Sequence, residues 1–259
     1  MTYRVLGQGT PLILVPGLAS TYRGYAPTLN RLGRRFRTIQ LDYPGEHPDD
    51  GSDLGRITHD DLVDDLAGLL DHLEIDRASL FGLSFGSTVV LRALERTPDR
   101  FFRAALQGGF ARRRLRPEER VALALGRRIR GTASRLPFHR RGLGRNNKET
   151  FPGDRPEVWA YYVEQNGLTP IAALSHRLDL LDRLDLRPVL PRIGHEVLVL
   201  HGTEDRIVPW RSHQELVAGL PGVRAVPMAG VGHQPHFTHA DAMADLLDQF
   251  FGAGTPDGA

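Results

Sequence analysis

Residues 81–91 read FGLSFGSTVVL and place one serine, Ser84, between Gly82 and Gly86, where an apolar run meets a helix-like run. The pattern predicts a strand that turns straight into a helix, with the serine held in a strained backbone and its hydroxyl exposed above the sheet. Side chains at the two glycine positions would collide with the neighbouring strand and helix. Such a serine is either a nucleophile or only the cap of the helix that follows.

Strands alternate with helices on both sides of this turn. Apolar runs bounded by turn residues predict strands at residues 2–7, 11–17, 36–45, 78–84, 102–109, 195–202 and 223–230. Caps and periods near 3.6 predict helices after Thr58 and at residues 87–95, 117–129, 156–165, 170–184 and 239–251. This alternation predicts an α/β fold with a doubly wound, mostly parallel sheet that carries helices on both faces.

Length and composition are those of an ordinary globular chain, with 259 residues, 41% of them hydrophobic and 25% charged. The chain has no cysteine, which excludes disulfides, thiolate catalysis and cysteine-ligated metals. The apolar stretch near the start, Leu12 to Pro16, is too short for a signal sequence or a membrane span. We therefore expect one cytoplasmic α/β domain with an insertion and no membrane contact.

A serine hydroxyl is a poor nucleophile at neutral pH, so Ser84 needs a histidine as base and a carboxylate that orients the histidine. Asp205 follows the strand EVLVLHG, and His233 follows the last strand in a loop flanked by glycine. Both lie at carboxyl ends of strands, where α/β sheets gather functional groups. The three residues are therefore predicted to act together. Neighbouring residues of the same types compete for these roles: Glu204, His236 and His239.

With these motifs the chain resembles the α/β-hydrolase superfamily over nearly its whole length. The motifs that carry the resemblance are LVPGLAS, GLSFGS, HGTEDRIVP and GVGHQPH. The resemblance implies an oxyanion hole made by two backbone N–H groups, those of Leu18 and Phe85. Many relatives have His-Gly where this chain has Pro16-Gly17. The departure is mild because the hole uses neither the side chain nor the N–H at position 16.

The resemblance also implies a reaction. Ser84 attacks an ester carbonyl, His233 moves the proton to the leaving alcohol, and water then cleaves the acyl-enzyme. Serine at this position, where dehalogenases and epoxide hydrolases of this fold have aspartate, disfavours those two activities. No cofactor is needed, and no metal-ligand spacing such as His-Glu-x-x-His occurs in the sequence. The same triad also supports hydrolysis of a carbon-carbon bond in a diketone, lactone opening or perhydrolysis, and the fold also serves non-catalytic ligand receptors.

Relatives carry a helical cap over the active site, which here corresponds to residues 110–186. The expected core is then formed by residues 1–109 and 187–251, and residues 252–259 are an expected flexible tail. Aromatic residues of the cap are predicted to line the substrate pocket: Phe138, Trp159 and Tyr162.

Positive charge is concentrated in one stretch of this cap. Residues 110–150 hold twelve arginines and one lysine against three glutamates, although the net charge of the whole chain is only +2. The stretch is either a solvated face or a docking surface for an acidic partner. Some capped relatives use arginines to hold an acyl carrier protein, and by analogy the candidates are Arg127, Arg128, Arg130, Arg140 and Arg141. Nucleic acid is not expected, because no aromatic residues are interleaved with the arginines.

Overall fold

A single sheet of seven strands forms the centre of the computed structural model, which describes residues 2–19, 21–47, 52–137 and 139–253. Its order is β1-β3-β2-β4-β5-β6-β7, and every neighbouring pair is parallel except β1 with β3. The strands are β1 (Tyr3–Leu6), β2 (Thr10–Val15), β3 (Phe36–Leu41), β4 (Ala78–Leu83), β5 (Phe101–Gln107), β6 (Val197–Gly202) and β7 (Val223–Met228). The prediction of a mostly parallel sheet is confirmed.

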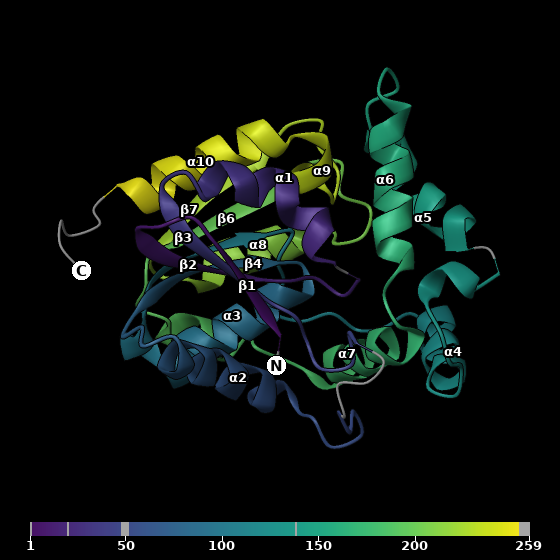
Figure 1. Cartoon of the computed structure of the whole chain (residues 1–259), viewed down its shortest axis with the longest axis horizontal. Helices are drawn as coiled ribbons and strands as arrows, with labels where there is room; N and C mark the ends of the chain where they lie inside the picture. Colours follow the sequence, from purple (N-terminus) through teal and green to yellow (C-terminus); the bar gives the residue numbers. More distant parts are fainter. Residues whose placement is uncertain (1, 20, 48–51, 138, 254–259) are drawn as a thin grey trace.

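Helices cover both faces of the sheet (Figure 1). One face packs against α1 (Tyr22–Leu32) and α10 (Ala240–Gly252), whose apolar side chains share a core cluster with Leu14 and Phe81. The opposite face packs against α2 (His59–His72), α3 (Phe85–Arg96) and α8 (Trp210–Gly219). Successive side chains of β2 therefore alternate between two cores, as the pleat of a strand requires.

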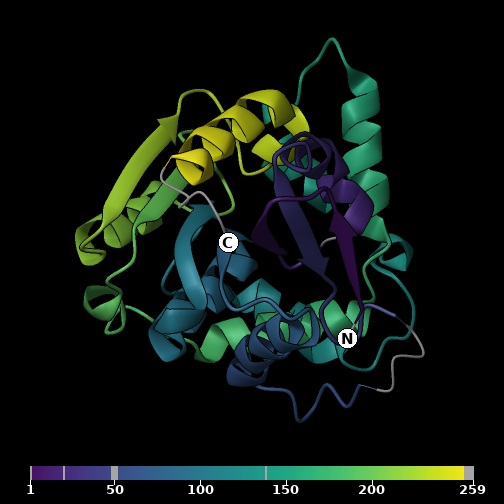
Figure 2. The same ribbon diagram turned by 60° about the vertical axis from the view of Figure 1, so that its left-hand side comes forward.

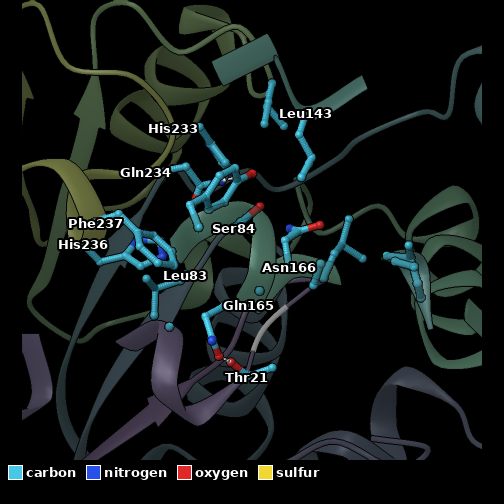
Figure 3. A pocket seen from close by; sticks show the side chains of 18 of the residues that line it. Thr21, Leu83, Ser84, Leu143, Gln165, Asn166, His233, Gln234, His236 and Phe237 are labelled. Atoms are coloured by element: carbon cyan, nitrogen blue, oxygen red, sulfur yellow. Dashed lines mark hydrogen bonds between the residues drawn. The ribbon is translucent and has the colours of Figure 1, made fainter. Parts of the chain in front are cut away.

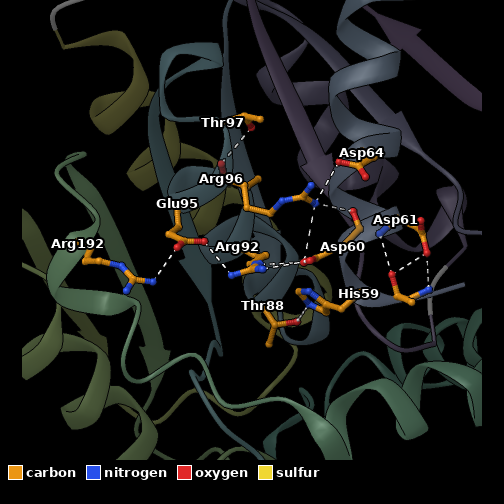
Figure 4. A network of polar contacts seen from close by, with 12 residues as sticks. His59, Asp60, Asp61, Asp64, Thr88, Arg92, Glu95, Arg96, Thr97 and Arg192 are labelled. Carbon is orange, nitrogen blue, oxygen red and sulfur yellow. Dashed lines mark hydrogen bonds and ion pairs between the residues drawn. The ribbon is translucent and has the colours of Figure 1, made fainter.

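Helices α2 and α3 are joined on their outer surface by a network of ion pairs (Figure 4). Arg92 of α3 binds both carboxylate oxygens of Asp60 in α2, at 2.8 and 3.1 Å, and also contacts Glu95 at 2.9 Å. The predicted cap Thr58 forms a complete capping box with Asp61 at the start of α2. This network fixes α3, the helix that follows Ser84, against α2.

The segment between β5 and β6 contains α4 (Pro117–Gly126), α5 (His139–Asn147), α6 (Pro156–Gly167) and α7 (Ile171–Arg183). In Figures 1 and 2, α4, α5 and α6 lie to one side of the sheet. Helix α6 is tied to the start of α1, because Tyr161 donates to the Arg23 carbonyl at 2.8 Å and Gln165 accepts from the hydroxyl of Thr21, the residue before α1, at 2.7 Å. Leu181 of α7 packs into the core. The helices predicted within residues 110–186 are therefore present.

Several details differ from the sequence predictions. The helix expected over residues 117–129 ends at Gly126, and α1, α5, α8 and the short α9 (Pro235–Thr238) were not predicted. The expected tail, residues 252–259, lies outside the described residues from position 254 onward. No helix in the described part of the chain is long and apolar enough to cross a membrane.

Candidate active site

Ser84 is at the sharp turn between β4 and α3, with φ of 49° and ψ of −113°. Positive φ is costly for a residue other than glycine, and such strain persists only where the surroundings fix it. The backbone N–H of Ser84 donates to the Gln107 carbonyl at 2.9 Å, and its own carbonyl accepts from the N–H of Ser87 at 3.0 Å. The Ser84 side chain makes no capping hydrogen bond to α3, so the interpretation of this serine as a helix cap is wrong.

The two glycines beside Ser84 allow this turn to pack closely. A Cβ at Gly86 would lie 2.1 Å from the Val15 carbonyl oxygen, and a Cβ at Gly82 would lie 2.8 Å from a Val90 methyl carbon. Both distances are far shorter than ordinary contacts. The predicted collisions with the neighbouring strand and helix are therefore confirmed.

Asp205 and His233 meet beside this turn. Nδ1 of His233 lies 2.5 Å from Oδ2 of Asp205, and both side chains are almost completely buried. The other carboxylate oxygen accepts backbone N–H bonds from Ile207 and Val208, each at 2.8 Å. These bonds fix the carboxylate in one orientation, and its hydrogen bond to Nδ1 sets the tautomer of the imidazole.

The charge of Asp205 is maintained despite its burial. Burial alone raises the pKa of a carboxylate, but His233 and the Val208 N–H outweigh burial, so the pKa of Asp205 lies below its usual value. A second histidine, His201 of β6, is completely buried behind the carboxylate, with Nε2 3.1 Å from the Val208 carbonyl. His201 therefore supports the loop that holds Asp205.

The competing residues are not part of this arrangement. Glu204 is exposed, while Asp205 contacts His233. His239 is exposed and contacts the neighbouring Thr238 hydroxyl at 2.7 Å. His236 is buried, and burial lowers its pKa to about 3, so its ring stays neutral at neutral pH. Of the three candidate histidines, His233, His236 and His239, His233 is the one that forms a hydrogen bond to Asp205.

Two tyrosines hold the turn that follows β2. The Tyr43 hydroxyl donates to the Pro16 carbonyl at 2.9 Å, and the Gly17 N–H donates to the Tyr25 hydroxyl at 3.0 Å. The Pro16–Gly17 turn is therefore fixed from both sides just before Leu18. Among the described residues, no hydrogen-bond acceptor is found for the N–H groups of Leu18 and Phe85, the two predicted oxyanion donors.

A cavity of about 320 Å³ opens in front of Ser84 (Figure 3). Ser84, Leu18 and His233 line one part of its wall. The remaining apolar wall is formed mainly by Leu136, Leu143, Leu174 and Ile207. Polar side chains also reach it, namely those of Thr21, Gln107, His139, Gln165, Asn166 and Gln234. A small and largely apolar chamber of this kind suits a compact neutral group with a few directed hydrogen bonds.

The predicted pocket residues have three different outcomes. Tyr162 lines the cavity, and its hydroxyl accepts a hydrogen bond from Gln234 at 3.3 Å. Trp159 does not line it; the indole packs edge-on against Phe151 and borders a neighbouring hollow instead. Phe138 lies outside the described residues. Trp159 was misplaced because periodicity identifies the inner face of a helix without saying whether that face meets a cavity or another ring.

Sequence reasoning missed the polar residues that position the site. Gln107 at the end of β5 is completely buried, and its amide donates to the His233 carbonyl at 3.1 Å. Gln165 binds Thr21 across the cavity wall, and His139 contacts Asn166 at 3.1 Å. The signal for Gln107 was its place directly after the apolar run Ala104 to Leu106 at the end of β5, beside Gly108. No group of three or more side chains that could hold a metal occurs in the described residues.

The arginines of residues 110–150 fall into two groups. Several are paired with acids of α7, such as Arg127 with Asp179 at 2.6 Å and Arg120 with Asp182 at 3.0 Å. Others are exposed and have no acidic partner within 4 Å among the described residues, including Arg128, Arg130, Arg140 and Arg141. Part of the predicted excess charge is therefore neutralised locally.

Comparisons with known proteins identify the family and the fold. A family model described as alpha/beta hydrolase fold matches residues 10–240. The pimeloyl-[acyl-carrier protein] methyl ester esterase of Xanthomonas oryzae pv. oryzae (strain MAFF 311018) is 28% identical over 260 residues, which cover 95% of this chain and 96% of the relative. The enol-lactonase from Burkholderia xenovorans LB400 superposes with a TM-score of 0.83 at 26% identity, over 97% of this chain and 96% of the other. A hydrolase from Pseudomonas aeruginosa PA01 gives the same TM-score at 25% identity, over 97% and 94% of the two chains.

Proposed function

The chain belongs to the α/β hydrolase fold family, and we propose that it is a serine hydrolase that cleaves a carboxylic ester through an acyl-enzyme. The observation that carries the proposal is the 2.5 Å hydrogen bond that Asp205 accepts from His233, which lines the same cavity as Ser84. In this mechanism His233 removes the proton from the Ser84 hydroxyl, and Asp205 stabilises the imidazolium that forms.

The charge that develops on the substrate needs its own donors. We assign this role to the N–H groups of Leu18, which lines the same cavity as Ser84, and of Phe85, which follows Ser84 in the chain. The Phe85 N–H is at the start of α3, where first-turn N–H groups have no partner within the helix. The two tyrosines around Pro16 and Gly17 keep the Leu18 peptide in place before the reaction, so no reorganisation is needed in the transition state.

Ser84→Ala tests the nucleophile. We expect hydrolysis of p-nitrophenyl esters to fall by about a thousandfold or more, because only binding and the oxyanion hole remain. The exposed serine Ser134 offers a matched control, and Ser134→Ala should keep the wild-type rate. An organophosphonate should label Ser84 in the wild-type protein. A label on another residue, or a Ser84→Ala variant with substantial activity, would overturn the assignment.

For the substrate, we propose an acyl ester carried by an acidic carrier protein. Two observations support this choice: the relative named as a pimeloyl-[acyl-carrier protein] methyl ester esterase, and the arginines at positions 128, 130, 140 and 141 that have no acidic partner among the described residues. Arg127 is already bound to Asp179, so it contributes less than its position in the sequence suggests. Long-range attraction of this kind weakens as salt rises.

The carrier hypothesis has a selective test. Arg128→Ser/Arg130→Ser should raise KM for a carrier-linked ester while leaving kcat for a small neutral ester unchanged, because docking contacts are equal in ground and transition states. Added salt should act in the same selective way. Equal effects on both substrates would leave these arginines as a solvated face.

Lactone opening is a second candidate reaction, because the enol-lactonase is 26% identical over nearly the whole chain. A lactone is a cyclic ester, so the same triad opens it by the same acyl-enzyme route. A panel of p-nitrophenyl esters of rising chain length, a lactone, a ring-cleavage diketone and peracid formation separates ester hydrolysis from the alternatives. A protein inactive on all of them, with an unlabelled Ser84, would instead be a ligand receptor.

A further inference from the structure

Arginines from three separate parts of the chain converge on one cavity beside the active site. This cavity, of about 560 Å³, is bordered by Ile207, which also lines the Ser84 cavity. Its wall contains seven arginines and two glutamates: Arg112, Arg113, Arg114, Arg116, Arg187, Arg206, Arg211, Glu119 and Glu215. The arginines come from the loop after β5, from the chain before β6, and from the loop after β6 together with the first turn of α8. Their convergence is therefore a property of the fold.

Local acids neutralise only part of this charge. Asp185 binds Arg112 and Arg187, at 3.3 and 2.5 Å, and its hydrogen bond to Arg187 lowers the pKa of Asp185 to about 2. Glu119 binds Arg113 at 2.5 Å. Burial opposes its ionisation, but the Arg116 N–H and the Arg113 guanidinium together lower the pKa of Glu119. Both carboxylates are therefore already ionised and engaged at neutral pH.

The remaining arginines divide into two kinds. Arg116 contacts Glu118 and Glu119, and Arg206 binds Glu149 at 2.6 Å. Arg114 and Arg211 are exposed and have no acidic partner within 4 Å among the described residues. With Glu215 included, five carboxylates stand near seven guanidinium groups, which leaves an excess of two positive charges.

Two further features favour an anion in this cavity. One guanidinium nitrogen of Arg113, Nη1, is buried without a hydrogen-bond acceptor among the described residues, which is unfavourable for a charged donor. Helix α8 begins at Trp210, and its first turn contributes Arg211 and Ser212 to the wall. The positive end of the helix therefore adds to the field of the arginines.

We propose that this arginine cavity binds a phosphate monoester. A phosphate monoester carries between about −1.5 and −2 charges at neutral pH and has three strong acceptor oxygens, which matches the excess of two cations. One guanidinium group can donate two parallel hydrogen bonds to two oxygens of the same phosphate. Arg114 and Arg211 are the two arginines of this cavity with no carboxylate that competes for these donors. The phosphate belongs either to the substrate itself, reaching past Ile207, or to a separate phosphorylated metabolite. The site does not depend on the proposed ester hydrolysis.

Isothermal titration calorimetry with glycerol 3-phosphate tests the site directly. We expect saturable binding to the wild-type protein and an increase in Kd of at least tenfold in Arg114→Gln/Arg211→Gln. The matched control is Arg34→Gln/Arg224→Gln, which removes the same charge from two exposed arginines outside the cavity and should change Kd by less than about twofold. Equal weakening in both double variants, or no saturable binding to the wild type, would overturn the proposal.

Chemical protection supplies a second measurement that needs no variant. Phenylglyoxal modifies accessible arginines, and glycerol 3-phosphate should protect Arg114 and Arg211 but not Arg34 or Arg224, as mapped by mass spectrometry. Protection of all four residues or of none would contradict a specific site. The titration repeated with Ser84→Ala should give the wild-type Kd, so a failure of the proposed esterase activity is distinguishable from a failure of this site.

A pair of esters distinguishes the two sources of phosphate. If the substrate carries the phosphate, an acyl ester of glycerol 3-phosphate should have a lower KM than the same acyl ester of glycerol, and Arg114→Gln/Arg211→Gln should remove the difference. If the phosphate belongs to a separate metabolite, the two esters should have equal KM values while the calorimetric binding remains. Both results support the arginine cavity as a phosphate site. The first assigns the bound phosphate to the substrate, and the second assigns it to a separate metabolite.

Discussion

Gly108→Ala should inactivate the protein by moving one imidazole ring. Gly108 follows β5 with φ of 55°, and an added Cβ would lie 2.8 Å from Cε1 and 2.9 Å from Nδ1 of His233. Carbon atoms in ordinary contact are about 3.5–4.0 Å apart, so the ring must move by roughly 0.7 Å or more. A displacement of about 1 Å in a catalytic group costs on the order of 100-fold in rate. We therefore expect kcat for a p-nitrophenyl ester to fall about 100-fold.

Gly230→Ala is the matched control, because Gly230 has φ of 71° and a Cβ there would meet nothing within 4 Å. Left-handed backbone costs a residue other than glycine about 1–2 kcal/mol, so urea unfolding should show both variants destabilised by about that amount. Only Gly108→Ala should lose activity. If Gly108→Ala keeps the wild-type kcat, or if both variants lose activity equally, the position of His233 does not govern the reaction.

Three further substitutions probe the support of the site. Asp205→Asn should lower kcat for a p-nitrophenyl ester by about 10⁴-fold, because the amide favours the unproductive tautomer of His233. Glu204→Gln should change kcat by less than about twofold. The reverse ranking would assign the orienting carboxylate to Glu204. Tyr43→Phe removes the hydrogen-bond donor to the Pro16 carbonyl and should lower the free energy of unfolding by about 1–3 kcal/mol. The same variant should lower kcat more than it changes KM. An unchanged kcat would mean that Tyr43 stabilises the fold without affecting the reaction. His236→Phe should flatten the loss of stability in acid. Because burial lowers the pKa of His236 from its ordinary value of 6.5 to about 3, the stability that its neutral ring contributes is complete above pH 6.5 and falls as the pH decreases toward 3, by up to about 1.4 kcal/mol per pH unit. If the free energy of unfolding changes equally with pH between pH 4 and 6.5 in the wild type and in His236→Phe, this prediction is wrong.

Most of the sheet could be predicted from the sequence because its strands are short apolar runs bounded by glycine and proline. All seven expected strands are present, and the capping box at Thr58 marks the start of α2. Helix α1 was missed for physical reasons: it contains Gly24 and Pro27, has no acidic residue in its first turn, and has no side-chain cap. Its stability comes from packing of Tyr25 and Leu29 against α10, which is a tertiary contact that periodicity in a single segment does not reveal.

The residues of the proposed active site show the same difference between local sequence signals and tertiary contacts. The proximity of Ser84, Asp205 and His233 could be predicted because Ser84 directly follows a strand and the other two lie in loops after strands, and the carboxyl ends of parallel strands meet at one edge of the sheet. The residues that hold these loops in place could not be predicted. Gln107 supports His233 from a strand 126 positions earlier in the chain, and Tyr43 supports Pro16 from 27 positions later. Nothing local in either segment indicates these partners.

The arginines illustrate why charge counted along a sequence is a poor guide to where charge acts. The stretch of residues 110–150 reads as a single basic block, yet Arg127 and Arg120 are bound to acids of α7, while Arg114 stands without such a partner. Arg211, outside that block and almost one hundred positions later, joins Arg114 at the same cavity. The local field depends on which carboxylates the fold brings within about 4 Å, since pairs at this distance interact far more strongly than charges separated by more than a Debye length of about 8–10 Å. At the two sites that we propose for anions, binding should therefore depend mainly on the arginines without acidic partners in the folded chain, and substitutions of the paired arginines should affect stability more than binding.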